Sequence, residues 1–390
     1  MTQISIAATT DIHGFLDEGL TALPTTLQEI SADLLLDNGD FFVGSSFASF
    51  GYDQGALSPL VTIANELAYD VMIPGNHDLD FGLTWLLRQV AELKADYICA
   101  NLKDADGVDL FPAYTIKTIK DSKVAVIGLM TAAFSQLSSL AVAEEVLVVD
   151  PFVALRGVLE HLHPEACDLV IVCYHGGLTN DPETGATWFY PSSEDQAYQL
   201  MEAFPEIDSL ICGHQHFTNH AQHPHQTALL QAGTRAHYLG HQLFDIEEGQ
   251  PTLVENRLLP LRAHDLAQSS AQAYPLGLKV RTAYQAWLQR SVNMASIRDW
   301  IKSRYPADYY QLDFQARNLA EFAAVLALPF PLSYYYLPGK EITQLLDGNL
   351  PLEPDQFYSV LAMTGRLPQT RLRQGLLLPL FDEIIKNKAY

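Results

Sequence analysis

The sequence has only four cysteines, and no two of them form a C-x-x-C pair. They are Cys99, Cys167, Cys173 and Cys212, and three of them lie in apolar runs that resemble β-strands. This usage is typical of buried thiols in a reducing compartment and does not indicate a disulfide framework.

Basic residues are also scarce, because 23 Lys and Arg stand against 46 Asp and Glu and leave a net charge of −23. A surface this acidic argues against a nucleic-acid polymer or an anionic membrane as the partner. A small anionic substrate is still compatible with it, because bound metal ions can reverse the local field.

Long apolar runs are missing as well, and none approaches the ~20 residues that a membrane-spanning helix needs. The chain begins with a strand-like run and shows no basic stretch followed by an apolar segment. We therefore expect a cytoplasmic protein.

The 390 residues suggest two or three domains, or one large and one small domain. Short apolar runs predict buried strands at Ile4–Ala8, Leu34–Asn38, Val71–Ile73, Tyr97–Asn101, Lys123–Leu129, Leu169–Tyr174 and Ser209–Cys212. Helical spacing predicts helices at Leu60–Ala68, Leu83–Leu93, Phe152–His161 and Glu194–Ala203. We expect a layered α/β domain over residues 1–262, a linker helix over 263–290 and a smaller unit over 291–390.

Side chains of metal-ligand type follow five of the predicted strands. The motifs are T-D-I-H-G with Asp11 and His13, N-G-D with Asp40, G-N-H-D-L-D with Asn76 and His77, Y-H-G-G with His175, and G-H-Q-H with His214 and His216. Each short motif alone is often a turn or a core residue. Their common place after strands predicts one site, because the carboxyl ends of the strands in such a sheet meet at one rim.

The ligand types and spacings also suit metal binding. Asp11 and His13 are two residues apart, so an extended chain would direct both to the same side. Carboxylate, imidazole and amide ligands together favour Mn, Fe, Co, Zn or Ni rather than Ca or Mg alone.

The order of these motifs resembles that of the calcineurin-like metallophosphoesterases. The longer form G-N-H-D-L-D-F-G looks like the branch of 5′-nucleotidases and 2′,3′-cyclic phosphodiesterases, and C-A-N-L at 99–102 and Q-A-G-T at 231–234 are similar too. The resemblance covers roughly residues 3–260. It implies an α/β fold, a four-layer α/β/β/α metallophosphoesterase sandwich, with a smaller, shortened C-terminal α+β domain.

The resemblance also implies roles for individual residues. Two divalent transition-metal ions, Mn, Zn, Fe or Co, would be the cofactors, and His77, oriented by Asp80, would lie near the leaving group. The implied ligands are Asp11, His13 and His216 for one ion, Asn76, His175 and His214 for the other, and Asp40 as the bridge between them.

The C-terminal unit resembles the nucleotidase specificity domain more weakly. Residues 293–301 look like its opening helix, and residues 329–346, with Tyr334, Tyr335 and Tyr336, look like its P-F segment. The family's glycine-rich segment is replaced by D-F-Q-A-R, in which Arg317 takes the place of a phosphate-contacting arginine.

These features predict an enzyme that hydrolyses phosphate esters of small molecules, above all nucleoside monophosphates or related nucleotides. A hydroxide held between the two ions would attack phosphorus, and Asn76 would contact the phosphoryl oxygens. The alternatives are a phosphodiesterase or phosphatase for cyclic nucleotides or sugar phosphates, a hydrolase of sulfur esters, and a non-catalytic metal or nucleotide sensor. Retention of every ligand together with His77 and Asp80 argues against the sensor.

Overall fold

The computed structural model describes residues 2–16, 18–55, 57–137, 140–163, 166–190, 192–261, 278–304, 307, 309–311, 316–321, 332–338, 357–363 and 372–375. The chain divides into two compact units, Met1–Leu276 and Gly277–Tyr390. Among the described residues, no helix has both the length and the apolar character that crossing a membrane requires.

Two six-stranded sheets form the centre of the described part of the first unit. In order across the first sheet, the strands are β14 (Gln250–Pro260), β13 (Tyr238–Glu247), β1 (Thr2–Thr9), β2 (Leu34–Asp37), β3 (Val71–Met72) and β4 (Asp96–Tyr97). Across the second sheet they are β11 (Thr218–Gln222), β12 (Ala228–Ala232), β10 (Ser209–Cys212), β9 (Leu169–His175), β7 (Ser122–Met130) and β6 (Tyr114–Ile119).

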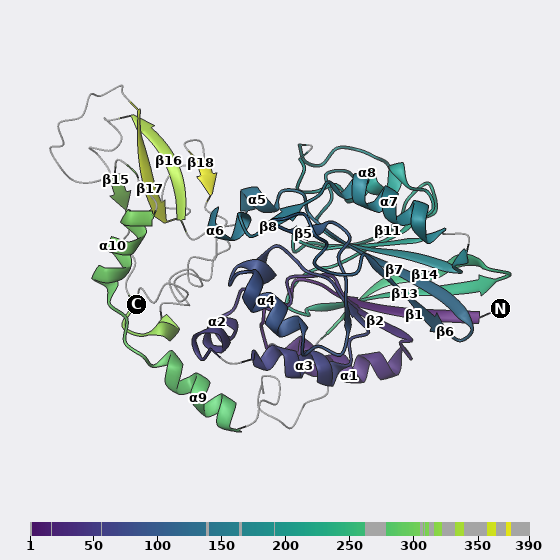
Figure 1. Cartoon of the computed structure of the whole chain (residues 1–390), viewed down its shortest axis with the longest axis horizontal. Helices are drawn as coiled ribbons and strands as arrows, with labels where there is room; N and C mark the ends of the chain where they lie inside the picture. The colour runs from purple at the N-terminus through teal and green to yellow at the C-terminus, as the bar shows by residue number, and fades with distance from the viewer. Residues whose placement is uncertain are drawn as a thin grey trace. The chain divides into compact units, whose positions relative to one another are not determined.

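Helices cover the outer faces of the two sheets. Figure 1 shows α1 (Glu18–Glu29) and α3 (Pro59–Leu67) along one side of the strands, and α7 (Pro151–Leu162) and α8 (Ala197–Ala203) along the other. The remaining elements of this unit are α2 (Ser46–Asp53), the 3-10 turn η1 (His77–Leu79), α4 (Leu83–Val90), β5 (Leu102–Asp104), α5 (Phe134–Leu137), α6 (Leu140–Ala143) and β8 (Val146–Val148). The predicted four-layer α/β/β/α arrangement is confirmed.

The alternation of side chains along the strands builds two apolar layers. In β7, Val124 and Val126 face the core between the sheets, whereas Ala125, Ile127 and Leu129 face the helices. Because neighbouring residues of a strand point to opposite faces, a run that is apolar throughout can serve both layers. Burying one such Val, Ile or Leu side chain contributes about 1.5–3 kcal/mol relative to leaving it exposed.

Helix α7 shows how local sequence fixes a covering helix. Asp150 caps its start by accepting the N–H groups of Phe152 and Val153, and Pro151 takes the first helical position, where no N–H is needed. Leu155, Val158, Leu159 and Leu162 then recur at helical spacing and lie in the core under β7 and β9.

The second unit contains α9 (Leu278–Leu288), α10 (Met294–Arg304), β15 (Tyr309–Gln311), β16 (Leu332–Pro338), β17 (Phe357–Met363) and β18 (Leu372–Gly375). The four strands of its described part form one sheet in the order β15-β17-β16-β18. Helix α9 lies within the predicted linker, and residues 263–277 of that linker lie outside the described residues, so the predicted domain boundaries remain predictions.

Candidate metal centre

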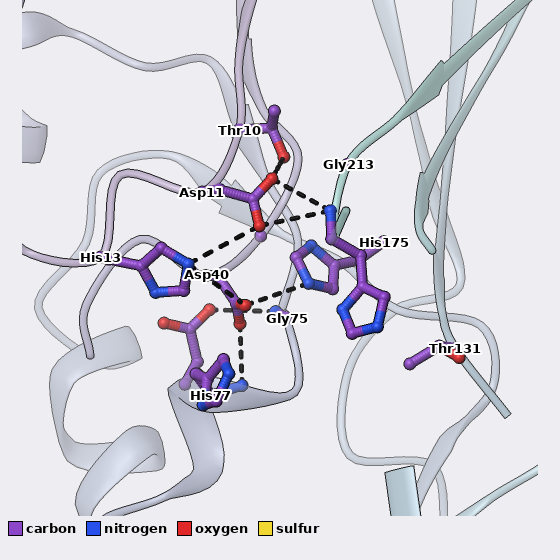
Figure 2. Close-up of polar contacts among 12 residues, drawn as sticks. Thr10, Asp11, His13, Asp40, Gly75, His77, Thr131, His175 and Gly213 are labelled. Atoms are coloured by element: carbon purple, nitrogen blue, oxygen red, sulfur yellow. Dashed lines mark hydrogen bonds and ion pairs between the residues drawn. The ribbon is translucent and has the colours of Figure 1, made fainter. Parts of the chain in front are cut away.

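The five sequence motifs lie where their strands end. Those after β1, β2 and β3 belong to the first sheet and those after β9 and β10 to the second, and the parallel pairings β1–β2, β2–β3 and β9–β10 place their carboxyl ends on common edges. Figure 2 shows Asp11, His13, Asp40 and His175 directed toward one another. The structure thus brings together side chains from both sheets.

Asp11, His13 and His216 form the first group of candidate ligands. Each offers one ligand atom, and these atoms lie within 4.8 Å of one another. The Nε2 atoms of His13 and His216 are 2.9 Å apart, and each approaches Asp11 Oδ1, at 3.7 Å and 3.4 Å. His13 Nδ1 donates to the carbonyl oxygen of Val43 at 2.8 Å, which leaves its Nε2 lone pair for a metal ion.

Asp40, His175 and His214 form the second group, under the same 4.8 Å limit. His175 Nδ1 donates to the carbonyl oxygen of Asn38 at 2.7 Å, so its Nε2 is again the free atom. All members of the two groups are predicted ligands, with Asp40 in the second group and Asn76 in the adjoining loop, and the assignment of the ligands to two ions remains a prediction.

Asp40 lies between the two groups. Its Oδ2 is 3.2 Å from His175 Nε2 and 3.8 Å from His13 Nε2, while its Oδ1 accepts the backbone N–H of His77 at 2.8 Å. One carboxylate oxygen is therefore held in place, and the other faces both groups. This is the position that a bridging ligand requires.

The donor set fits metal ions because three buried ligand atoms lack a hydrogen-bond partner. Among the described residues, Asp40 Oδ2, Asn76 Oδ1 and His175 Nε2 are buried in this way. A buried polar atom with no partner, such as Asn76 Oδ1, costs about 1–3 kcal/mol, and Asp40 Oδ2 and His175 Nε2 face only each other, at 3.2 Å. A cation at this place would satisfy all three atoms, and each of them belongs to a ligand that the sequence predicts.

The backbone of the centre differs from the expected extended conformation. Asp11, His13, Asp40, His214 and His216 all have positive φ, between 53° and 68°. The expectation that extended chain directs Asp11 and His13 to one side is therefore wrong. Left-handed turns direct them inward instead, and strain of this kind concentrates at functional sites.

The electrostatics of the centre follow from burial and charge. Burial lowers the pKa of His13 to about 4 against the opposing effect of Asp40 and Asp11. Burial also lowers the pKa of His175, but Asp40 and Asp11 raise it more, to about 9. Burial raises the pKa of Asp40, yet His175 and His77 lower it well below its ordinary value. Asp40 is thus an anion and His13 is neutral, and a metal ion bound at His175 would have to displace a proton.

His77 and Asp80 form the predicted pair beside the ligands. His77 Nδ1 lies 2.7 Å from Asp80 Oδ2, and its ring lies 5.4 Å from that of His13, edge to face. The carboxylate accepts the Nδ1 proton, which directs the other ring nitrogen away from Asp80. The His77 side chain is 25% exposed, so the ring is partly open to solvent.

Two positioning residues are absent from the sequence prediction. Asp78 accepts the N–H groups of Gly75 at 3.0 Å and Phe42 at 2.8 Å, and so ties the G-N-H-D loop to the chain after N-G-D. Its place inside the G-N-H-D-L-D motif is a signal that could have revealed it. Glu194 Oε1 lies 2.8 Å from His214 Nε2, and no motif marks this residue.

The predicted helix Glu194–Ala203 begins three residues late, at Ala197. Glu194 therefore lies in the preceding loop, where its backbone carbonyl accepts the hydroxyls of Thr131 and Tyr174. These contacts hold the carboxylate next to His214.

Arg317, the predicted phosphate contact, lies in the second unit. Its side chain is 89% exposed and forms an ion pair with Glu321. Its contact with phosphate remains a prediction. Tyr334, Tyr335 and Tyr336 lie on β16, and their side chains fall outside the described part of the structure.

Known proteins resemble the chain in both sequence and fold. The family model for calcineurin-like phosphoesterase matches residues 4–217. A 2′,3′-cyclic-nucleotide 2′-phosphodiesterase/3′-nucleotidase of Salmonella typhimurium is 29% identical over 202 residues, which are 48% of this chain and 30% of that protein. The trifunctional nucleotide phosphoesterase protein YfkN of Bacillus subtilis is 25% identical over 246 residues, 55% of this chain and 16% of that protein. The matched part thus spans less than a third of either relative.

A solved structure extends the likeness of fold to both units. A putative 5′-nucleotidase from Staphylococcus aureus, solved in complex with alpha-ketoglutarate, superposes with a TM-score of 0.73 and 18% identity. The superposition covers 98% of this chain and 96% of the other. The predicted combination of a sandwich with a C-terminal domain is therefore confirmed.

Proposed function

Because the chain belongs to the calcineurin-like phosphoesterase family, we propose that it is a two-metal hydrolase whose substrates are nucleoside monophosphates or related nucleotides. Members of this family are metal-dependent phosphoesterases, and the candidate ligand groups of this chain agree with that chemistry. The proposal concerns the number of ions, the roles of the residues and the substrate.

The unpaired ligand atoms are the observation that carries the proposal. Asp40 Oδ2 faces both groups, and it is buried without a hydrogen-bond partner in the described part of the chain. Asp11, His13 and His216 would hold one ion, and Asn76, His175 and His214 the other. Two such ions, when bound, neutralise charge on the phosphoryl group and lower the pKa of water to near neutrality.

His77 acts on the leaving group. Asp80 accepts its Nδ1 proton at 2.7 Å and stabilises a positive charge on the ring, so a proton on Nε2 is available for the leaving oxygen. The backbone N–H of His77 bonds Asp40, which keeps the ring in register with the metal ligands. This arrangement separates the acid from the ligands and needs no covalent intermediate.

The relatives support a nucleotide as the substrate. Both sequence relatives are named for nucleotide hydrolysis. Sugar phosphates and cyclic nucleotides present the same phosphoryl group to that centre, so they are the substrates to compare.

Turnover of a substrate panel tests the proposed function. Purified protein loaded with Mn²⁺ is assayed for phosphate release from AMP, GMP, CMP and UMP, and from 2′,3′-cyclic AMP and glucose 6-phosphate. We expect multiple turnovers that chelation abolishes, with the highest kcat/KM for a nucleotide. Turnover that never exceeds that of the Asp40→Asn variant on any ester would contradict hydrolysis and favour a non-catalytic sensor.

A further inference from the structure

In the part of the chain that the structure describes, exposed aromatic side chains are confined to two short segments of the first unit. Trp188 is 45%, Phe189 47%, Tyr190 95% and Phe217 54% exposed. Among the described residues, every other large apolar side chain with comparable exposure is aliphatic. We name these four residues the aromatic rim. Exposed apolar groups gathered in this way mark binding surfaces.

The rim adjoins the metal centre in the sequence and in space. Phe217 directly follows His216, a ligand of the first group. The ring of Phe189 lies parallel to that of Phe217, with 6.2 Å between centroids and 17° between planes. The two segments of the rim are thus in contact beside a ligand.

Hydrogen bonds of the Gln215 side chain and of the backbone tie the rim to the G-H-Q-H loop. Gln215, between the two histidines of that motif, accepts the N–H of Leu178 at 2.9 Å and donates to its carbonyl at 3.0 Å. The next carbonyl, that of Thr179, accepts the N–H groups of Trp188 at 2.9 Å and Phe189 at 3.0 Å. The aromatic residues are therefore held by the same loop that presents the ligands.

The segment 176–194, in which the structure describes residues 176–190 and 192–194, is anchored at both ends. It begins directly after His175, and Glu194 at its end bonds His214 Nε2 at 2.8 Å. Between these ends, Asp181 closes a turn by accepting two backbone N–H groups through Oδ1. These bonds help to hold Phe189 against Phe217, the residue that follows the candidate ligand His216.

The charge of the segment indicates what it binds. Residues 176–194 contain no Lys or Arg but include Asp181, Glu183 and Glu194. This composition repels a phosphate group, whereas the faces of four aromatic rings suit a flat, neutral aromatic group. The phosphoryl group of a substrate would therefore bind at the metal centre and its aromatic part at the rim.

We propose that the aromatic rim binds the nucleobase of the substrate, as a subsite that belongs to the first unit itself. This proposal rests on the proposed function, because it concerns the part of the same site that would bind the nucleoside, which is the leaving group. Stacking of a base on an aromatic side chain tolerates any base, since every base has a π-face. The rim therefore distinguishes nucleotides from sugar phosphates without selecting among nucleotides.

A comparison of AMP with ribose 5-phosphate tests the subsite in steady-state kinetics. The double variant Phe189→Leu/Phe217→Leu keeps apolar side chains but removes two rings. We expect its KM for AMP to rise about tenfold relative to its KM for ribose 5-phosphate, which has no base. Val254→Ala is the control, because Val254 is 51% exposed on β14 and lies outside the rim. An unchanged KM ratio in the double variant overturns the proposal.

Binding of adenosine provides a readout that does not depend on hydrolysis. Isothermal titration with adenosine and with ribose is expected to show adenosine bound more tightly by the native chain and about tenfold more weakly by the double variant. Equal affinities for the two compounds overturn the subsite even if the chain hydrolyses phosphate esters. Rim-dependent adenosine binding without any hydrolysis overturns the proposed function and leaves the subsite. A lower Tm of the double variant with an unchanged KM ratio shows instead that the rim packs against protein.

Discussion

Five residues of the metal centre adopt a backbone conformation that residues other than glycine seldom adopt. They are Asp11, His13, Asp40, His214 and His216, with φ from 53° to 68°. A left-handed residue costs about 1–2 kcal/mol, so the surrounding structure must stabilise these turns. The letters of a motif give the type of ligand but not its dihedral angles. For this reason the sequence predicts the ligands, whereas it gives the wrong conformation for the D-x-H segment.

His77 is the residue whose variant separates catalysis from metal binding. We expect His77→Asn to reduce kcat by about two to four orders of magnitude, because the leaving oxygen loses its proton donor. The loss should be smaller for nitrophenyl phosphate, whose leaving group needs less protonation. Steady-state kinetics with parallel metal analysis measure both effects. Loss of bound metal in this variant would show that His77 is a ligand instead.

Glu194 Oε1 lies 2.8 Å from Nε2 of His214, a contact that would position this ring. Glu194→Ala should weaken the binding of the weaker Mn²⁺ ion by about 10–100-fold, as is typical when a ligand histidine loses its carboxylate partner. Glu183→Ala removes the same charge from the same segment and is the control. Isothermal titration with Mn²⁺ measures the affinities, and equal values for the two variants would rule out the positioning role.

At the scale of elements, the loop after β3 crosses close to the loop after β2. A Cβ atom on Gly75 would lie 2.1 Å from Asp40 Oδ1 and 2.4 Å from the Asp40 backbone nitrogen. Gly75→Ala should therefore lower the free energy of unfolding by about 1–3 kcal/mol and weaken metal binding, because the two loops must separate.

A second glycine variant is the control for this effect. Gly157 lies within α7, and a Cβ there meets no heavy atom within 4 Å. Gly157→Ala should raise the free energy of unfolding by about 0.5–1 kcal/mol, because alanine favours the helix. Urea denaturation measures both variants, and a Gly75→Ala protein as stable as Gly157→Ala would contradict the close approach of the loops.

The sequence predicts those elements best whose residues are apolar throughout. Strand β10 begins and ends as predicted, β9 ends one residue later than predicted, and β7 is one residue longer at each end. Strand β13 has no such run, because it buries His241 and Gln242. Their partners are Ser5, at 3.0 Å, and Ser209, at 2.6 Å. The residues of these two hydrogen bonds are 236 and 33 positions apart in the sequence. Such distant pairs leave no pattern of apolar residues within the strand itself, so β13 could not be predicted from the sequence.

The presence or absence of a local sequence pattern also explains which site residues were predicted and which were missed. The metal ligands each belong to a motif directly after a strand, so their types and positions are visible in the sequence. Glu194 acts through His214, which is 20 residues away, and its own neighbours show no motif. Residues that position a ligand from a loop become apparent only when the fold is known.

At the scale of the whole molecule, the acidic chain must accept an anionic substrate. Its net charge of −23 repels phosphate esters, so affinity depends on the metal ions and on contacts to the rest of the substrate. We expect AMP, GMP, CMP and UMP to differ by less than about tenfold in kcat/KM, or ~1.4 kcal/mol, because stacking tolerates any base. Steady-state kinetics measure the four values. A hundredfold preference for one base would indicate a specific pocket.

Metal content tests the dinuclear centre most directly. Glu202, His223 and His225 also bring ligand atoms within 4.8 Å of one another and could bind a further ion. Bound ions are therefore counted in the His225→Ala variant, the parent chain, in which this third group has lost a ligand. After loading with Mn²⁺ and removal of free ions, elemental analysis should find about two ions per parent chain. Asp40→Asn on that parent should retain about one ion or fewer, because the bridging carboxylate is lost. A reproducible value of about one or fewer in the well-folded parent chain would contradict a centre of two ions.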